Sequence, residues 1–220
     1  MNKYTQMQKG FYQAGTSNHL EHNENKDYWD ILLKDLKDPK LWVNKVALDF
    51  GSGMGRNVTN MLSLCDWQRV DGVDISEGNI SKCKEEYADQ SSDWYCNNGT
   101  DLEALQSDEY DFIMSTVVLQ HIPVHEIRRK LLKEMYRVLK KDGILSVQMA
   151  FGPKDEARAL YFDNKYDAQG TNSMFDVRVT SVDEVVKDFE SMGFTNVICE
   201  IRDSFSDNQH PQWIFIRAEK

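Results

Sequence analysis

The sequence predicts an α/β fold: a doubly wound, mostly parallel seven-stranded sheet with helices on both faces and a C-terminal antiparallel hairpin. Two observations predict this class. Five short apolar segments alternate with amphipathic ones, which is typical of parallel strands joined by right-handed helical crossovers. The last two apolar segments, 195–201 and 213–218, are joined by a polar turn without a helix, so we expect them to pair antiparallel at a sheet edge.

The elements follow in order along the chain. Strands are predicted over 46–50, 69–75, 93–97, 110–115 and 144–151, each apolar and bounded by polar or glycine residues. Helices are predicted over 27–37, 57–65, 76–88, 124–141 and 181–193, where apolar residues recur at spacings of three and four. We expect Ser76 to cap the helix that it begins, the helix over 124–141 to end at Asp142-Gly143, and Ser181 and Glu184 to form a capping box.

One domain is expected over residues 27–220, since 220 residues lie near the size of a single domain. A polar arm, 1–26, precedes this domain and is expected to act as a lid. Residues 152–180 separate the fifth strand from the next helix by more than an ordinary connection. This insertion is therefore a candidate wall of a substrate pocket.

Charge and cysteine usage exclude several classes. Lys and Arg total 26 against 36 Asp and Glu, giving a net charge of −10, the opposite of the basic surplus that nucleic-acid binders use. The four cysteines are scattered, which fits neither a zinc knuckle nor a disulfide framework. Apolar runs are too short to span a membrane. We expect a cytoplasmic protein, monomeric or homodimeric, that acts without nucleic acid, membrane or metal.

Glycines at alternate positions follow the first strand. The segment is Asp49-Phe50-Gly51-Ser52-Gly53-Met54-Gly55, and the missing Cβ atoms let a ligand approach the backbone where a helix begins. Asp74 ends the second strand, where a carboxylate accepts hydrogen bonds from both hydroxyls of a ribose. Together these features predict a cofactor that contains adenosine.

The glycine spacing distinguishes between such cofactors. Dinucleotide-binding proteins use G-x-G-x-x-G, whereas this chain has G-x-G-x-G followed by Arg56, which disfavours a nicotinamide-dependent oxidoreductase. The segment VALDFGSGMGRN resembles the first motif of the class I S-adenosylmethionine-dependent methyltransferases. GVDIS (72–76), NNGTDLEAL (97–105), YDFIMSTVVLQHIP (110–123) and RVLKKDGIL (137–145) resemble the later motifs in the same order. The resemblance covers residues 27–220 and is closest to the methyltransferase-11/25-like, small-molecule type.

The resemblance implies the cofactor S-adenosylmethionine, the product S-adenosylhomocysteine and a set of binding residues. Asp49 would approach the cofactor ammonium, Gly51 and Gly53 would underlie the methionine part, and Asp74 would hold the ribose. The residues implied around the adenine and the methyl group are Ile75, Asn98, Thr100, Asp101, Leu102, Ser115, Thr116 and Gln120. Asn98 stands where the family often has an acid, and Lys141-Asp142 stands where it often has Pro-Gly.

His121 follows the fourth strand and has an ordinary pKa near neutrality, so it is a candidate general base, with a structural histidine as the alternative. His121 and His125 are four residues apart, but Pro123 lies between them and no further ligand completes a metal site. The basic face of the helix over 124–141 is interleaved with glutamates, as on a solvated helix. After the fourth strand, DNA amino-methyltransferases carry an Asn/Asp-Pro-Pro-aromatic motif. This chain has Ser115-Thr116-Val117-Val118 there, which disfavours methylation of amino groups in DNA.

Aromatic and imidazole side chains of the arm and the insertion are candidate contacts for the methyl acceptor. They are Tyr12, His19, Tyr28, Trp29, Tyr161 and Tyr166. The function expected is transfer of a methyl group to an O, N or S nucleophile of a small molecule. Two alternatives remain open at this point: a nicotinamide-dependent oxidoreductase, and a catalytically silent subunit that binds the cofactor.

Overall fold

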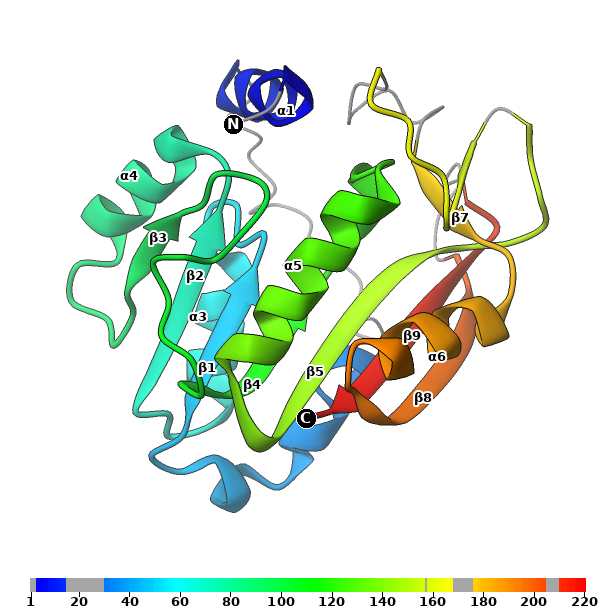
Figure 1. The fold of residues 1–220 in the computed structure, drawn as a ribbon. Helices are drawn as coiled ribbons and strands as arrows, with labels where there is room; N and C mark the ends of the chain where they lie inside the picture. The colour runs from blue at the N-terminus through cyan, green and yellow to red at the C-terminus, as the bar shows by residue number, and fades with distance from the viewer. Residues whose placement is uncertain (1–2, 15–29, 157, 168–175, 205–209) are drawn as a thin grey trace.

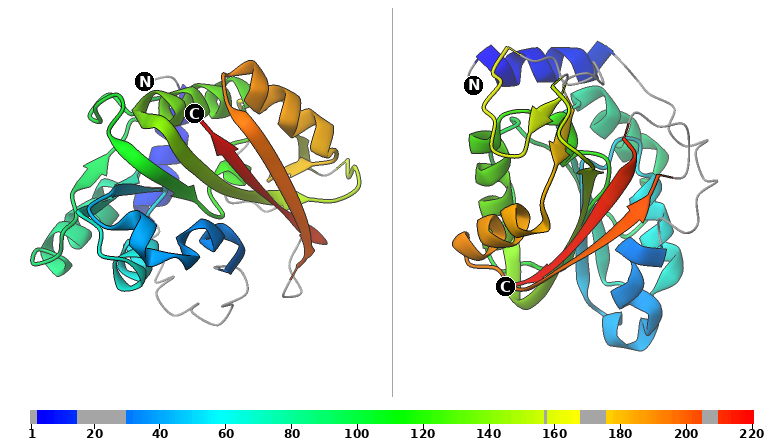
Figure 2. Two further views of the ribbon diagram at one scale, coloured as in Figure 1. Left: turned by 90° about the horizontal axis from the view of Figure 1, so that it is seen from below. Right: turned by 90° about the vertical axis from the view of Figure 1, so that its right-hand side faces the viewer.

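The computed structural model describes residues 3–14, 30–156, 158–167, 176–204 and 210–220. These residues form one sheet with helices on both faces (Figures 1 and 2). The strands are β1 Val46–Phe50, β2 Arg69–Asp74, β3 Trp94–Cys96, β4 Tyr110–Ser115, β5 Leu139–Phe151, β6 Ala159–Leu160, β7 Val177–Val179, β8 Thr195–Asp203 and β9 Gln212–Glu219. The α-helices are α1 Lys3–Ala14, α3 Arg56–Leu64, α4 Glu77–Glu86, α5 His125–Val138 and α6 Val182–Ser191, and the short 3-10 helices are η2 Lys34–Lys37, η3 Pro39–Trp42 and η4 Leu119–His121.

The strand order confirms the predicted fold class. Strands β3, β2, β1, β4 and β5 are parallel neighbours in that order, β9 pairs antiparallel with β5, and β8 pairs antiparallel with β9. The described sheet has nine strands, because the insertion adds the short strands β6 and β7 to the predicted seven.

The two added strands lie at the carboxyl edge of the sheet, where the parallel strands end. On one side of β5, β4 pairs as far as Val147, and β9 occupies the other side from Ile144 to Phe151. β7 pairs with Ala150 and Phe151, beyond the point where β4 ends, and β6 pairs with β7. The insertion therefore continues the sheet above β4 and places a wall at this edge.

Two apolar cores lie on opposite faces of the sheet. On one face, Leu131, Leu132 and Met135 of α5 and Phe189 of α6 join the buried side chains of β1, β4 and β5. On the other face, α3, α4, η2 and η3 cover the sheet, with Trp42 and Trp67 among the buried side chains. Helices thus cover both faces, and the carboxyl edge is where a ligand can reach the backbone.

Helix α5 ends earlier than predicted. It stops at Val138, and the residues expected to form its last turn begin strand β5 instead. Contacts with distant segments hold these residues: Leu139 pairs with Tyr110 of β4, the amide of Asp142 donates to the carbonyl of Lys220 at 3.0 Å, and the Lys220 ammonium donates to the carbonyl of Leu139 at 2.7 Å. Pairing between residues distant in sequence overrides the helical periodicity here.

Of the two helix caps predicted at serines, one is confirmed and one is wrong. Ser76 caps α4 as expected, accepting a hydrogen bond from the amide of Asn79. The capping box at α6 is wrong, because the Ser181 side chain makes no capping hydrogen bond and Thr180 donates to Glu184 instead. Within the predicted helix over 27–37, the described part is a helical turn followed by η2 rather than a continuous α-helix.

Helix α1 lies across the carboxyl edge of the sheet, above α4 and α5 (Figure 1). It belongs to the arm predicted as a lid. Its buried side chains are Tyr4, Thr5 and Gln8, two of them polar, so little apolar area holds it to the domain. The remainder of the arm lies outside the described residues.

Candidate active site

The glycine loop joins β1 to α3 at the carboxyl edge. Gly51, Gly53 and Gly55 all have positive φ, at 78°, 52° and 84°, a conformation that strains other residues. A Cβ at Gly51 would lie 2.2 Å from Cγ2 of Val118, so only glycine fits there. A Cβ at Gly53 would meet no described atom within 4 Å. The loop is thus packed tightly on one side and open above Gly53.

Asp49, at the end of β1, is fully buried beside this loop. Its Oδ1 accepts a hydrogen bond from Nδ2 of Asn57 at 3.2 Å, and its Oδ2 has no hydrogen-bond partner among the described residues. Burial raises the pKa of Asp49 to about 7. A buried carboxylate oxygen without a partner is costly, and an ammonium group beside it would remove that cost. The site therefore fits the amino group of a methionine moiety.

Asp74 closes the other side of the glycine loop. Its Oδ2 accepts from the amide of Gly53 at 3.0 Å and its Oδ1 from the amide of Ser76 at 2.8 Å. Burial raises its pKa. A carboxylate has about four acceptor positions, so Asp74 keeps capacity for two ribose hydroxyls. A Cβ at Gly99 would lie 2.9 Å from Cδ1 of Ile75, which brings Ile75 to the loop that follows β3.

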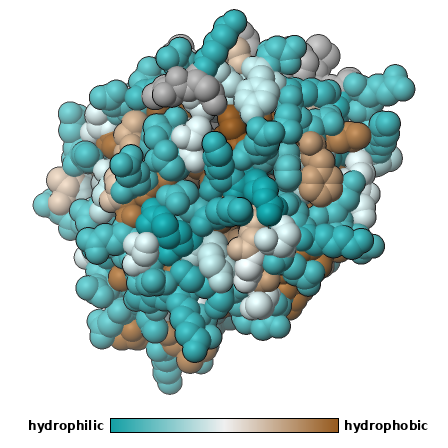
Figure 3. Space-filling view, in the orientation of Figure 1, coloured by the Kyte–Doolittle hydropathy of each residue, from teal (hydrophilic) through white to brown (hydrophobic). Residues whose placement is uncertain are grey.

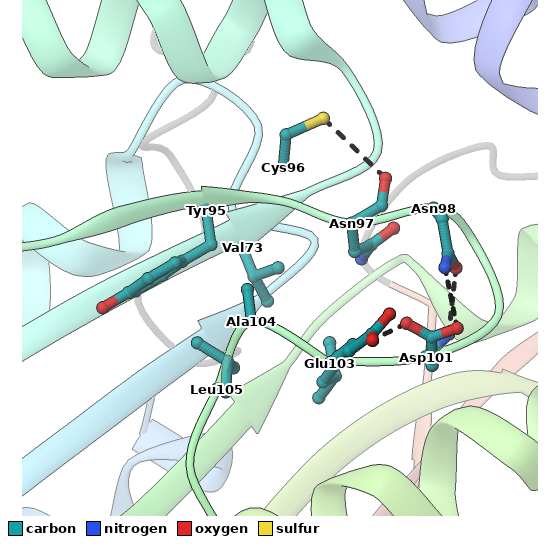
Figure 4. A pocket seen from close by; sticks show the side chains of 10 residues that line it. Val73, Tyr95, Cys96, Asn97, Asn98, Asp101, Glu103, Ala104 and Leu105 are labelled. Atoms are coloured by element: carbon teal, nitrogen blue, oxygen red, sulfur yellow. Dashed lines mark hydrogen bonds between the residues drawn. The ribbon is translucent and has the colours of Figure 1, made fainter.

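That loop contains the residues implied for the adenine. Oδ1 of Asn98 accepts from the amide of Thr100 at 2.8 Å, and Nδ2 of Asn98 donates to Oδ2 of Asp101 at 2.7 Å. A cavity of about 320 Å³ lies beside the loop, and Figure 4 shows Asn98 and Asp101 pointing toward each other at one end of it. It is lined by Val73, Tyr95, Cys96, Asn97, Asn98, Asp101, Leu102, Glu103, Ala104 and Leu105.

Helix α5 holds the same loop through two residues that sequence reasoning missed. Oε2 of Glu134 accepts from the amide of Leu102 at 3.1 Å, and Nη2 of Arg137 donates to the carbonyl of Leu102 at 3.0 Å. Glu134 and Arg137 also pair with each other, at 2.7 Å. Their spacing of three on a helix predicts the ion pair between them, but nothing in the sequence predicts that this pair binds the backbone of Leu102.

The turn after β4 lies beside the glycine loop. Ser115, Thr116 and Gln120 are buried, and Ser115 Oγ and Gln120 Oε1 have no partner among the described residues. Val117 has φ 57°, which is strained for a β-branched residue. Oε1 of Gln148, in β5, accepts from the amide of Val117 at 2.8 Å and so supports this turn. Gln148 was also missed; its one signal is that it interrupts an apolar strand.

His121, in η4, contacts a carboxylate from the insertion. Its Nδ1 lies 2.8 Å from Oδ1 of Asp176, and Oδ2 of Asp176 lies 3.2 Å from Nε2 of His210. Burial raises the pKa of Asp176, but hydrogen bonds from the two imidazoles outweigh it, so the pKa lies below its usual range. Asp176 is therefore ionised near neutral pH. Neither Asp176 nor His210 was among the predicted site residues.

His121 and His125 do not converge on one ligand. His125 Nε2 contacts Oδ2 of Asp188 at 3.0 Å, on α6, whereas His121 contacts Asp176. Within the described ranges, no group of three or more His, Cys, Asp or Glu side chains could hold a metal ion.

Two of the predicted acceptor contacts are described in the insertion. Tyr161 is 1% exposed and its hydroxyl donates to Oδ2 of Asp188 at 3.0 Å, with the guanidinium of Arg128 over its ring. These contacts give Tyr161 a packing role between α5 and α6. Tyr166 is exposed, and its hydroxyl donates to Oε2 of Glu126 at 2.7 Å.

Tyr12 of α1 lies over the carboxyl edge. Its pKa is raised well above the usual range by burial and, to a smaller extent, by the negative charges of Asp176 and Asp74. Its hydroxyl therefore lies within electrostatic range of both the predicted ribose carboxylate and the partner of His121. The other candidate contacts, His19, Tyr28 and Trp29, lie outside the described residues.

On the face drawn in Figure 3, hydrophilic side chains predominate and hydrophobic ones are scattered among them. Three basic residues of α5 and early β5 make ion pairs: Arg129 with Asp188, Arg137 with Glu134 and Lys140 with Asp111. The prediction of a solvated basic face is wrong at Arg128, which is buried and donates to the carbonyls of Ile122 and Tyr161. No described helix has the length and apolar character to cross a membrane.

Comparisons with known proteins bear on the type of domain. A family model described as a methyltransferase domain matches residues 48–147. A search of curated proteins by sequence finds no match.

Solved structures share the fold. The chain is similar to one in the complex of the Haloferax volcanii Trm112 methyltransferase activator with a methyltransferase (TM-score 0.66, 13% identity, 94% of this chain and 96% of that chain). It is similar to an S-adenosylmethionine-dependent methyltransferase of Mesorhizobium loti (TM-score 0.65, 15% identity, 90% of this chain and 99% of that chain). It is also similar to phosphoethanolamine N-methyltransferase 2 of Haemonchus contortus in complex with phosphomonomethylethanolamine and S-adenosylhomocysteine (TM-score 0.61, 15% identity, 94% of this chain and 60% of that chain).

At these identities, the structural likeness establishes the fold, and the family model adds the identity of the domain over the motif-bearing residues. The glycine loop, the unpartnered oxygen of Asp49 and the carboxylate of Asp74 lie in the arrangement that the cofactor needs. Residues 48–147 therefore match a methyltransferase domain, and the chain shares the fold of solved S-adenosylmethionine-dependent methyltransferases.

Proposed function

We propose that this protein transfers a methyl group to an O, N or S nucleophile of a small molecule. The observation that carries the proposal is the covering of the carboxyl edge: α1 lies across it, and β6 and β7 add a wall beside it. A site covered from two sides favours a small acceptor over a folded macromolecule. The net charge of −10 also disfavours a nucleic-acid acceptor.

The residues present fit the cofactor. Asp49 would pair with the ammonium, the backbone above Gly53 would face the methionine part, and Asp74 would accept the ribose hydroxyls. Ile75, Asn98, Thr100, Asp101 and Leu102 would surround the adenine. When bound, S-adenosylmethionine supplies a methyl group on a sulfonium, which is a good leaving group.

The protein's contribution is then mainly alignment. Holding the acceptor nucleophile in line with the methyl group can supply about 7–11 kcal/mol of the barrier reduction. Ser115, Thr116 and Gln120 offer buried polar atoms beside the methyl position. His121 would act as the general base for a hydroxyl acceptor, a contribution of about 10²- to 10⁴-fold. Tyr12 and Tyr166 are the described candidates for acceptor contacts.

Thermal denaturation tests the cofactor. Saturating S-adenosylhomocysteine, at about 100 times its Kd, should raise Tm by about 5–10 °C, because about 2.7 kcal/mol of binding linkage is spread over a chain of this size. NAD should leave Tm unchanged. Stabilisation by NAD alone would favour the nicotinamide-dependent oxidoreductase instead.

A labelling experiment tests the acceptor. The purified chain is incubated with S-adenosylmethionine carrying a deuterated methyl group and a pool of small hydroxyl, amine and thiol compounds, and mass spectrometry follows the label. We expect labelled small molecules, and none with Gly51→Ala, whose Cβ would lie 2.2 Å from Val118. Because the Haloferax volcanii structure contains the Trm112 activator, the chain is assayed alone first. Cofactor binding without transfer to any acceptor would indicate a silent subunit.

A further inference from the structure

Two imidazoles flank one buried carboxylate at the acceptor side of the carboxyl edge. His121 comes from the turn after β4, Asp176 from the end of the insertion, and His210 from the segment before β9. Nδ1 of His121 lies 2.8 Å from one carboxylate oxygen, and Nε2 of His210 lies 3.2 Å from the other. Asp176 is 5% exposed and His210 is 2% exposed, so both are shielded from water.

The chemistry of these groups fixes the positions of their protons. An ionised carboxylate only accepts hydrogen bonds, so each imidazole must donate through the nitrogen that faces Asp176. His121 therefore carries its proton on Nδ1, and in its neutral form Nε2 has a free lone pair. His210 carries its proton on Nε2, and its Nδ1 is buried without a partner among the described residues.

Both carboxylate oxygens are held by these contacts. Rotation of the carboxyl group away from His121 would break the hydrogen bond from His210 as well. The ring of Trp213 packs against the imidazole of His210 at 5.4 Å between ring centroids, tilted by 55°, and restricts this second imidazole in turn. The orientation of His121 is thus fixed from two elements outside its own turn.

Tyr12 of α1 connects the cluster to the predicted ribose carboxylate. The hydroxyl of Tyr12 lies within electrostatic range of both Asp176 and Asp74, so α1 passes near both carboxylates. The ionisable groups shown to interact with Asp176 are thus His121 from η4, His210 from the segment before β9 and Tyr12 from α1.

We propose that Asp176 is a positioning residue for methyl transfer, holding His121 with Nε2 unprotonated and directed at the acceptor, and that His210 locks Asp176 in that orientation. This rests on the proposed function, since it assigns the base of the same reaction. It gives the insertion a role in the chemistry, beyond that of a wall.

The step balances as follows for a hydroxyl acceptor. The oxygen lone pair forms the new bond to the methyl carbon as the carbon–sulfur bond of the cofactor breaks, with its electron pair remaining on sulfur. The acceptor proton passes to Nε2 of His121, forming an imidazolium. That cation donates through Nδ1 to the carboxylate of Asp176, which stabilises the new positive charge. The imidazolium returns its proton to water when the products leave.

Long-range ¹H–¹⁵N spectra of the histidine rings test the proposal in the complex of the full chain with S-adenosylhomocysteine. In spectra recorded at about pH 8.5, a neutral ring reports which of its nitrogens carries the proton. We expect His121 protonated on Nδ1. His125 provides an internal control of the opposite sense, because its Nε2 faces Asp188 and should carry the proton. A proton on Nε2 of His121 in the wild-type protein would overturn the proposal without any variant.

Asp176→Ala and His210→Phe extend the test. Asp176→Ala should abolish the preference of His121 for Nδ1–H, leave His125 unchanged and leave S-adenosylhomocysteine affinity unchanged by calorimetry. His210→Phe should keep the tautomer of His121 but broaden its signals. If His121 keeps Nδ1–H alone in Asp176→Ala, another group orients it and the proposal is wrong. The spectra need no acceptor, so they are independent of the labelling experiment: absence of methyl transfer would contradict the proposed function and leave the tautomers measurable.

Discussion

The two halves of the site are built in different ways. In the cofactor half (residues 49–105), the hydrogen bonds around the two carboxylates join nearer positions: Asn57 with Asp49 is 8 residues apart, Ser76 with Asp74 is 2 and Gly53 with Asp74 is 21. The loop at Leu102 is the exception, because α5 holds it from 32 and 35 residues away. In the acceptor half, defined by the contacts of His121, Asp176 and His210, the partners are 55 and 34 residues apart. Backbone amides dominate around Asp74, whereas paired side chains dominate around Asp176.

The difference separates binding from chemistry. A loop of glycines and one carboxylate can be built within a short motif, because the backbone supplies the donors. Orienting an imidazole as a base requires side chains from several segments, because the carboxylate partner has to contact one particular ring nitrogen. Substitutions in the cofactor half should therefore change affinity, and those in the acceptor half should change turnover.

The sharpest test of this separation is His121→Ala. We expect kcat to fall by about 10²- to 10⁴-fold with S-adenosylhomocysteine affinity within a few fold of wild type, because a general base acts in the transition state only. Steady-state kinetics with an acceptor found by labelling, and calorimetry, measure the two quantities. His125→Ala is the matched control, since His125 contacts Asp188 outside the site. A kcat that survives in His121→Ala would leave this histidine with a structural role.

Asp74→Ala tests the other half. Two hydrogen bonds from ribose hydroxyls to a charged acceptor are worth about 1.5–3 kcal/mol each, and water replaces them in part, so binding should weaken by about 2–4 kcal/mol. Because Asp74 also accepts from the amides of Gly53 and Ser76, Asp74→Asn separates ribose binding from support of the loop. Titration calorimetry with S-adenosylhomocysteine gives the affinities. Equal affinity in wild type and both variants would remove Asp74 from the ribose.

The pH dependence of binding examines Asp49. Burial raises its pKa to about 7, so the ligand-free protein binds a proton there that pairing with an ammonium must displace. S-adenosylhomocysteine affinity should rise by up to about tenfold per pH unit between about pH 5 and pH 7, then level off. Asp49→Asn should flatten this profile.

The stability of the ligand-free protein should change in the opposite direction. A carboxyl with a raised folded-state pKa stabilises the fold below its unfolded pKa, and this contribution is lost as the pH rises from about 4 to about 7. Chemical denaturation across this range measures it. Parallel rather than opposite trends in affinity and stability would argue against Asp49 as the ammonium partner.

The smallest expected effect concerns α1, which passes near Asp74 of one half and Asp176 of the other. We expect the arm around residues 11–22, including the C-terminal end of α1, to exchange its amide hydrogens more slowly when S-adenosylhomocysteine is bound, by about tenfold or less, because the bound ligand adds contacts to a helix held by few apolar side chains. Hydrogen exchange measured by mass spectrometry compares the exchange rates of the arm with and without the ligand, and α6 is the internal control. Equal exchange with and without ligand would make α1 a fixed element.

The sequence predicts the fold class, and it predicts the glycine loop and its neighbouring carboxylates as one candidate site, for a physical reason. Asp49, Gly51 and Asp74 stand in motifs whose function depends on local backbone geometry, so their spacing carries the information. The acceptor half is predicted only at His121. Asp176 and Gln148 could not be identified, because nothing local distinguishes an aspartate that meets an imidazole 55 residues away from one that faces water. The early end of α5 was missed for the same reason, as the residues after it contact Tyr110 and Lys220 in distant segments.

The pairing of β7 with the end of β5 has a consequence for chimeric proteins. In a chimera, the insertion would be exchanged as one segment, which begins after Ala150 and Phe151 and ends at the start of α6. Exchanging this segment between homologous methyltransferases would move Asp176 but leave His210 behind, because His210 lies on the C-terminal hairpin. A graft that keeps the proposed contact between Asp176 and His210 therefore has to carry both segments of the chain.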